Sequence, residues 1–234
     1  MVVLLLDGLV AFVLWATSTP EPGPSAVAAL ESDDLVQVIE RDGYTFRPTE
    51  PARVGFVFYP GGRVDPASYA APARAIAEEG FLVVVPELTL NLAVLDPNAA
   101  DDVIASHPEV ERWVIGGHSL GGAMAAGYAS DNRDAISGLV LWAAYPADST
   151  DLSTFDAPVA SIFGTRDGLT TLDDIDDSRR RLPADTAFVA IDGGNHAQFG
   201  DYGPQAGDNE ATISRAEQQA IAVQGSLQVL RADD

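Results

Sequence analysis

The feature that most constrains the fold of this chain is a serine between two glycines. It lies between an apolar run and a stretch of small residues. The segment Gly117–Gly121 has the sequence Gly-His-Ser-Leu-Gly; residues 113–115 before it are apolar, and residues 123–129 after it are mostly small. This context predicts a strand, a sharp turn and a helix. Ser119 then lies on a nucleophile elbow, whose crowded backbone admits only glycine on either side. The free N–H groups of the helix point at the place where an oxyanion would develop.

Strands and helices alternate over most of the remaining chain. Alternating residues around Asp42-Gly43 predict an antiparallel hairpin. Strands are expected at 54–59, 81–85, 113–115, 139–144, 159–163 and 188–191, the first two of them buried, and helices at 67–79, 98–106, 123–129, 172–182 and 211–230. This order predicts an α/β fold with a mostly parallel sheet, helices on both faces and the hairpin at one edge. Catalytic loops should follow the carboxyl ends of the strands.

An elbow serine needs a base and an acid, which follow it in the chain in the order acid, then histidine. Of the three histidines, only His196 follows Ser119; it comes directly after the last predicted strand. The alternative for His196 is a surface-loop histidine. Asp167, in Gly-Thr-Arg-Asp-Gly after the strand at 159–163, is the predicted acid, which would fix the tautomer of the imidazole. The acidic residues at 173–177 are interpreted as a solvated helix face, because their spacing matches no calcium loop.

An oxyanion hole needs two N–H donors. The first is the backbone N–H of Leu120, the residue after the nucleophile, and the second should come from the loop after the strand at 54–59. That loop begins Pro-Gly-Gly-Arg. Gly62 is the favoured donor, with Arg63 as the alternative, because a glycine lets backbone approach the substrate closely.

Together, Ser119, Asp167, His196 and the loop at Gly61–Gly62 resemble the α/β-hydrolase superfamily over about Val54 to Leu230. The pattern is similar to small, lid-less members of the dienelactone-hydrolase-like or carboxylesterase-like kind. The serine departs from the cysteine elbow of dienelactone hydrolases and from the aspartate of haloalkane dehalogenases. The resemblance also implies an open, shallow pocket, because the segment 144–158 is too short for an inserted lid.

Two aromatic regions lie near the expected site. The loop Phe199–Pro204 either shapes one wall of the pocket or packs locally, and Trp142 either lines the pocket or belongs to the core. The expected function is a serine hydrolase that cleaves carboxylic esters of small substrates through an acyl-enzyme, with no metal or organic cofactor. The alternatives are a non-catalytic, surface-anchored binding protein on the same scaffold, or an amidase, thioesterase or acyltransferase.

The charge of the chain is strongly negative. It has 35 acidic and 13 basic residues, a net charge of −22, and every basic residue is arginine. An acidic surface without lysine indicates a protein from a salt-loving microbe, and it excludes nucleic acid as a partner. The chain has no cysteine, so it has no disulfides or thiol chemistry.

The first residues differ from the rest in composition. Residues 1–18 are mostly apolar and predict a signal peptide or membrane anchor, residues 19–25 a linker, and residues 26–234 the hydrolase domain. The apolar run is shorter than the ~20 residues of a spanning helix. A signal peptide or an anchor implies that the protein is secreted or anchored on the outer face of a membrane. The alternative is a cytoplasmic protein with a hydrophobic N-terminal helix packed on its domain. The oligomeric state is not indicated.

Overall fold

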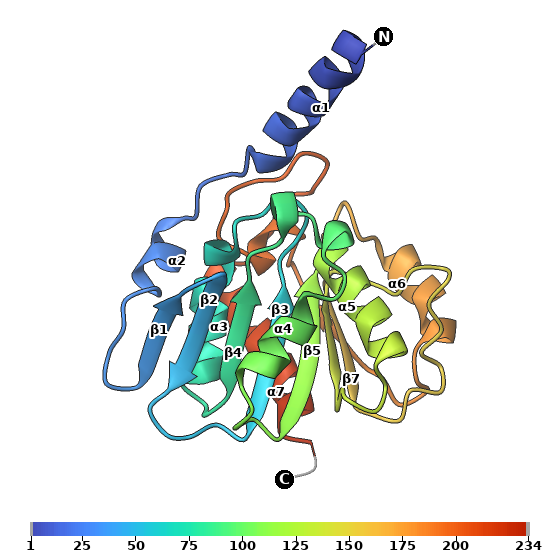
Figure 1. Cartoon of the computed structure of the whole chain (residues 1–234). Coiled ribbons are helices and arrows are strands. Elements are labelled where there is room, and N and C mark those ends of the chain that lie inside the picture. The colour runs from blue at the N-terminus through green and yellow to red at the C-terminus, as the bar shows by residue number, and fades with distance from the viewer. Residues whose placement is uncertain (1, 233–234) are drawn as a thin grey trace.

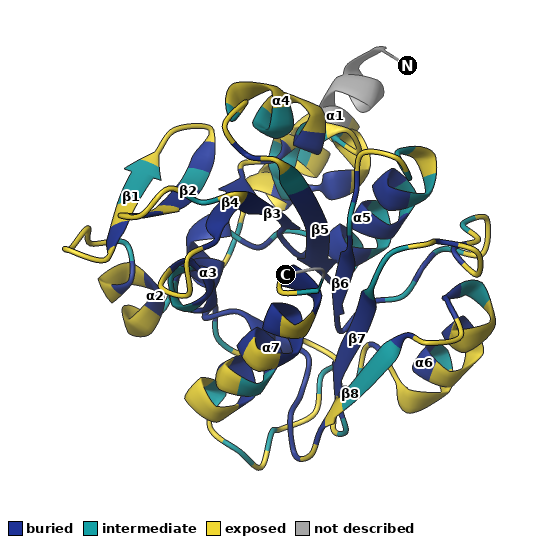
Figure 2. Ribbon diagram, turned by 90° about the horizontal axis from the view of Figure 1, so that it is seen from below, coloured by how far each residue is buried: buried dark blue, intermediate teal, exposed yellow. Residues whose placement is uncertain are grey.

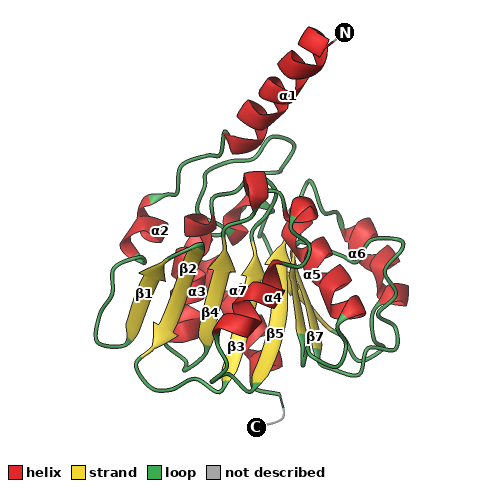
Figure 3. Cartoon of the chain, viewed as in Figure 1, coloured by secondary structure: helices red, strands yellow, loops and turns green. Residues whose placement is uncertain are grey.

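A twisted sheet of eight strands forms the centre of the computed structural model, which describes residues 2–232 (Figures 1 and 3). The strand order is β1-β2-β4-β3-β5-β6-β7-β8, antiparallel along β1, β2 and β4 and parallel from β4 to β8. The strands are β1 (Val36–Glu40), β2 (Gly43–Pro48), β3 (Val54–Tyr59), β4 (Leu82–Pro86), β5 (Arg112–His118), β6 (Leu139–Trp142), β7 (Val159–Gly164) and β8 (Ala187–Ile191). The predicted parallel sheet with an antiparallel edge hairpin is confirmed.

Helices cover both faces of this sheet. They are α1 (Val2–Thr17), α2 (Pro24–Ala28), α3 (Ala70–Ala77), α4 (Ala99–Ser106), α5 (Leu120–Asp131), α6 (Leu172–Ser178) and α7 (Arg215–Leu230). Helices α3 and α7 pack on one face, and α4 and α5 pack on the other (Figure 2). Because both faces are covered, β3 to β7 are buried nearly throughout, which explains their continuous apolar runs.

Three predicted helices differ from the observed ones at their starts by more than one residue. The helix expected at 123–129 begins earlier, at Leu120, directly after the elbow serine. The helix expected from residue 67 begins as a 3-10 turn, Pro66–Tyr69, whose cap is Asp65. The helix expected from residue 211 begins at Arg215, because the hydroxyl of Ser214 accepts the N–H of Glu217 and caps the first turn.

Helix α1 leaves the molecule at the edge where the parallel strands end, and the C-terminus lies at the opposite edge (Figure 1). The guanidinium of Arg63 donates to the carbonyls of Trp15 and Ser18 and lies over the Trp15 ring. Among residues 2–232, no helix combines the length and the apolar character needed to cross a bilayer. The last residues of the predicted linker belong to α2, where the buried carboxylate of Asp201 accepts hydrogen bonds from Ser25.

Candidate active site

Ser119 lies at the end of β5, in a backbone conformation that non-glycine residues rarely adopt. Its φ is 52° and its ψ is −123°, and α5 begins at the next residue. Such a conformation costs on the order of 1–3 kcal/mol and persists only where the surroundings fix it. Here the N–H of Ser119 donates to the carbonyl of Trp142 on β6 at 3.0 Å. The serine side chain is thereby presented on a sharp turn between a strand and a helix.

The two glycines of the motif are required by close contacts of the backbone. A Cβ on Gly121 would lie 2.2 Å from the carbonyl oxygen of Pro60, and one on Gly117 would lie 2.6 Å from the carbonyl carbon of Gly121. Real Cβ atoms do not approach backbone this closely, so the crowding predicted from the sequence is present. The start of α5 therefore packs directly against the loop that follows β3.

Asp167 and His196 meet after β7 and β8. Nδ1 of His196 lies 2.9 Å from Oδ2 of Asp167, and both side chains are almost fully buried. The other carboxylate oxygen accepts the N–H groups of Leu169 and Thr170 at 2.8 and 2.7 Å. With the carboxylate held in this way, the imidazole is oriented with Nε2 directed away from Asp167.

Nε2 of His196 is buried and has no hydrogen-bond partner within residues 2–232, so the structure shows no bond from it to Ser119. The two residues are nonetheless close neighbours in the fold, because the ring of His118, the residue before Ser119, lies 4.5 Å from the ring of His196. Bonds between nucleophile and base are often loose without substrate and tighten when substrate binds.

Two side chains that the sequence analysis did not identify hold these loops. One oxygen of Asp208 accepts the N–H of Gly168 and the other accepts the N–H of Ala197. Gln218, on α7, bonds both backbone groups of Asn195, at 3.0 and 2.7 Å. Asp208 and Gln218 therefore fix the residues next to Asp167 and His196. Only the three-dimensional contacts reveal them, since glutamine and aspartate at these positions carry no motif.

Between Pro60 and Val64, the first part of the loop after β3, one N–H group makes no hydrogen bond within the described residues. The N–H groups of Gly61, Arg63 and Val64 donate to Tyr69, Asn91 and Gly61 respectively, at 3.0, 2.7 and 3.1 Å. Within the described part of the chain, the N–H of Gly62 has no acceptor. A Cβ on Gly62 would lie 3.1 Å from Cδ2 of Leu120, so the loop adjoins the start of α5. The geometry therefore favours Gly62 over Arg63 as the second oxyanion donor.

The aromatic residues near the site belong to the packed interior. Trp142 is 1% exposed and donates from Nε1 to the hydroxyl of Ser226 on α7, so it is a core residue. Phe199 is also fully buried, and its ring stacks against that of His118 at 5.6 Å. The loop after His196 is expected either to shape a wall of the pocket or to pack locally. Phe199 packs locally.

The acidic helix α6 has the exposed face that its sequence predicts. Asp173, Asp176 and Asp177 are exposed, and Thr171 and Asp174 form a capping box at its start. Among residues 2–232, no group of three or more histidine, aspartate or glutamate side chains is arranged to hold a metal ion.

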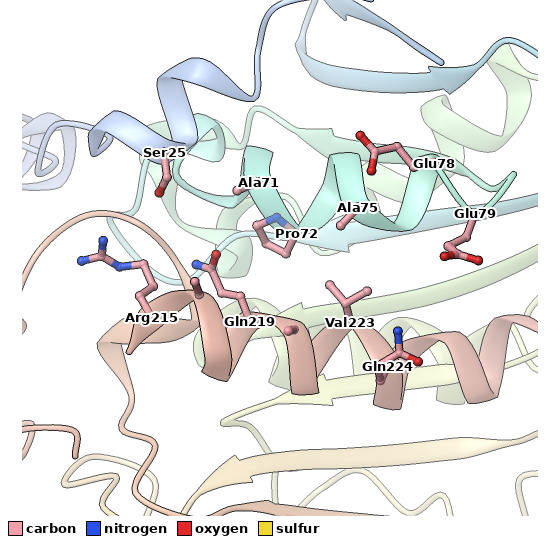
Figure 4. A pocket seen from close by; sticks show the side chains of 12 residues that line it. Ser25, Ala71, Pro72, Ala75, Glu78, Glu79, Arg215, Gln219, Val223 and Gln224 are labelled. Atoms are coloured by element: carbon pink, nitrogen blue, oxygen red, sulfur yellow. The ribbon is translucent and has the colours of Figure 1, made fainter. Parts of the chain in front are cut away.

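A groove lies between α3 and α7, apart from these residues (Figure 4). Its volume is about 530 Å³, and Ala71, Ala75 and Val223 form much of its apolar wall. Figure 4 shows Arg215 at one end of the groove and Glu79 at the other. None of Ser119, Asp167 and His196 lines this groove, so it is separate from the candidate active site.

Comparison with known proteins identifies the family of the chain. A model of the alpha/beta hydrolase family matches residues 55–220, well over half of the chain. None of the curated proteins compared with the chain matches it. The matched region begins in β3, includes the elbow at Ser119 and the pair Asp167–His196, and ends within α7. The chain is therefore a member of the alpha/beta hydrolase family.

Proposed function

We propose that this hydrolase is a serine esterase that cleaves carboxylic esters of small substrates through an acyl-enzyme. The observation that carries the proposal is the buried Asp167–His196 pair, whose ring packs beside the elbow residue His118. A carboxylate that orients an imidazole with a free outer nitrogen is the arrangement of a general base for a serine nucleophile. Family membership supports hydrolysis but leaves the ester substrate and the serine mechanism to experiment.

In the proposed mechanism, Oγ of Ser119 attacks the ester carbonyl carbon while Nε2 of His196 takes the serine proton. The oxyanion that forms accepts the N–H groups of Leu120 and Gly62. Collapse of this intermediate breaks the bond to the alcohol oxygen, which takes the proton from His196. Water then attacks the acyl-enzyme with His196 as base, the bond between the acyl carbon and Oγ of Ser119 breaks, and Oγ takes the proton from His196 as the acid is released. Asp167 stabilises the imidazolium in both halves of the reaction.

Hydrolysis of short and long p-nitrophenyl esters in concentrated KCl tests this proposal. The wild type should prefer short chains, as the open pocket of small, lid-less carboxylesterase-like relatives implies, and Ser119→Ala should lose activity by on the order of 10⁴-fold or more. Ser130→Ala, at the other end of α5, is the matched serine control. Full activity of Ser119→Ala would refute the mechanism. Failure of a fluorophosphonate probe to label folded wild type would instead favour a binding protein on a hydrolase scaffold.

We also propose that residues 1–18 attach the chain to a membrane surface, on the outer face of the cell. Four apolar residues of α1 are each 41–65% exposed, and they point to different sides of the helix: Val10, Phe12, Leu14 and Trp15. An apolar helix exposed all round needs a nonpolar surrounding. Flotation with zwitterionic vesicles should carry the wild type upward and should fail for Leu14→Glu. Val27→Glu, at a 54% exposed valine on α2, is the control; equal flotation of all three chains would contradict the proposal.

A further inference from the structure

A buried chain of hydrogen bonds joins the loop that carries Gly62 to the elbow. The hydroxyl of Tyr69 accepts the N–H of Gly61 at 3.0 Å and lies 2.8 Å from Nδ1 of His118. Tyr69 and His118 are each 1% exposed, so water does not compete for these bonds. The chain thus runs from the residue before the proposed oxyanion donor to the residue before the proposed nucleophile.

The bond from Gly61 has a fixed direction, because a backbone N–H only donates, whereas the direction of the bond to His118 depends on the tautomer of its ring. Because the hydroxyl of Tyr69 accepts from Gly61, its own hydrogen can be donated to Nδ1 of His118, which then carries its proton on Nε2. Burial, and next the nearby His196, lower the pKa of His118 well below 6.5, so the imidazole stays neutral. Burial raises the pKa of Tyr69, so the phenol keeps its hydrogen.

These bonds fix the peptide that bears the N–H of Gly62. The N–H of Gly61 is held by Tyr69, and its carbonyl accepts the N–H of Val64 at 3.1 Å. The carbonyl of Gly61 and the N–H of Gly62 belong to one planar peptide unit, so holding the first orients the second. A Cβ on Gly61 would lie 2.8 Å from Nδ1 of His118, so only glycine allows this approach.

We infer that Tyr69 and His118 are positioning residues, which hold the Gly61–Gly62 peptide so that the N–H of Gly62 points at the oxyanion. The inference rests on the proposed function, since it needs Ser119 as nucleophile. It assigns a role to the histidine of the Gly-His-Ser-Leu-Gly segment that the motif itself does not give.

The first test compares two buried tyrosines. Tyr69→Phe removes the hydroxyl between Gly61 and His118. Tyr59→Phe is the matched control, because the hydroxyl of Tyr59 is also buried and also bonds backbone, at Ala100 and Pro97. Both variants should lose stability. Only Tyr69→Phe should lower kcat for p-nitrophenyl esters and the rate of fluorophosphonate labelling of Ser119, on the order of 10- to 100-fold, with KM unchanged.

The second test replaces His118. In His118→Asn the amide oxygen can accept from Tyr69 near the position of Nδ1, whereas His118→Leu fills the space without an acceptor. We expect labelling of Ser119 to stay near the wild-type rate in the Asn variant and to fall in the Leu variant by the same factor as in Tyr69→Phe.

The outcomes separate the two proposals. Equal labelling rates in Tyr69→Phe and Tyr59→Phe would overturn the positioning role, even where both lose stability. Should Tyr69→Phe not fold, equal rates in His118→Asn and His118→Leu would overturn it instead. A wild-type chain that is folded but not labelled at Ser119 overturns the proposed function itself, and the positioning role with it.

Discussion

At the scale of single residues, the site depends on a histidine that must stay neutral. His118 is surrounded by Tyr69, Phe199, Tyr202 and His196, whose rings lie 4.5–6.4 Å from its own. A charged imidazolium there would lose its hydration and repel a protonated His196. The pKa of His118 is therefore lowered well below 6.5, with burial as the larger cause.

This lowered pKa predicts a pH dependence of stability. Below its ordinary pKa of 6.5, His118 in the unfolded chain binds a proton that the folded chain does not bind. The unfolded state then holds more protons, so the free energy of unfolding decreases as the pH falls, by up to about 1.4 kcal/mol per pH unit from this group. Above pH 6.5 His118 is neutral in the unfolded chain as well, so the effect vanishes. Denaturant titrations from about pH 7.5 to about pH 5 should show this decrease in the free energy of unfolding in the wild type but not in His118→Asn. Identical slopes would mean that His118 titrates normally in the fold.

Single residues also show what the sequence can and cannot predict. Motif and chain order alone predict Ser119, Asp167 and His196, because the elbow is local and the order of its partners is a property of the fold. The pairing of Asp167 with His196 is present. Motif and chain order do not identify three other residues, because each acts on a residue that only the folded chain brings near: Tyr69, Asp208 and Gln218. The choice of Gly62 over Arg63 likewise needs the contact between Arg63 and Asn91.

At the scale of elements, the start of α5 packs tightly against the end of β3. Gly121 lies against the carbonyls of Tyr59 and Pro60 at the end of β3, where backbone cannot move aside. A Cβ on Gly127 of the same helix, in contrast, would have nothing within 4 Å. One helix therefore contains a glycine that packing requires and a glycine that it does not.

This contrast makes a paired prediction. Gly121→Ala should destabilise the protein by about 1–3 kcal/mol or more, because the methyl group would push α5 from the loop that carries Gly62. It should also lower esterase activity. Gly127→Ala should stabilise the protein by up to about 1 kcal/mol, since alanine favours a helix over glycine, and should leave activity unchanged. Denaturant unfolding and p-nitrophenyl ester assays check both. A Gly121→Ala variant as stable and active as Gly127→Ala would show that the contact is not tight.

Elements are predicted well where periodicity is strong. The buried strands and the edge hairpin follow directly from apolar runs and from the turn at Asp42-Gly43, because both depend on neighbours in the chain. Helix starts are predicted less accurately. The cap at Ser214 and the 3-10 turn before α3 depend on single side-chain hydrogen bonds that periodicity does not contain.

At the scale of the whole molecule, charge sets the conditions in which this fold is stable. The net charge of −22 is spread along the chain, and α6 alone exposes Asp173, Asp176 and Asp177. Mutual repulsion of so many carboxylates favours expanded states, and dissolved ions weaken it. The Debye length falls from about 30 Å at 0.01 M salt to about 3 Å at 1 M, so most of this repulsion is screened in molar salt.

We therefore expect the unfolding temperature to rise with KCl concentration from dilute buffer to molar salt, because added ions screen the repulsion between carboxylates. Salt also strengthens apolar burial, so the charge effect needs its own control. The double variant Asp173→Asn, Asp177→Asn removes two exposed carboxylates for which no bonded partner is seen in residues 2–232, and it should gain less from added KCl than the wild type. Thermal melts across a KCl series measure, for each of the two chains, the slope of the unfolding temperature against KCl concentration. A wild-type melt that does not change with KCl would refute adaptation to salt, and equal slopes in the two chains would attribute the gain to apolar burial.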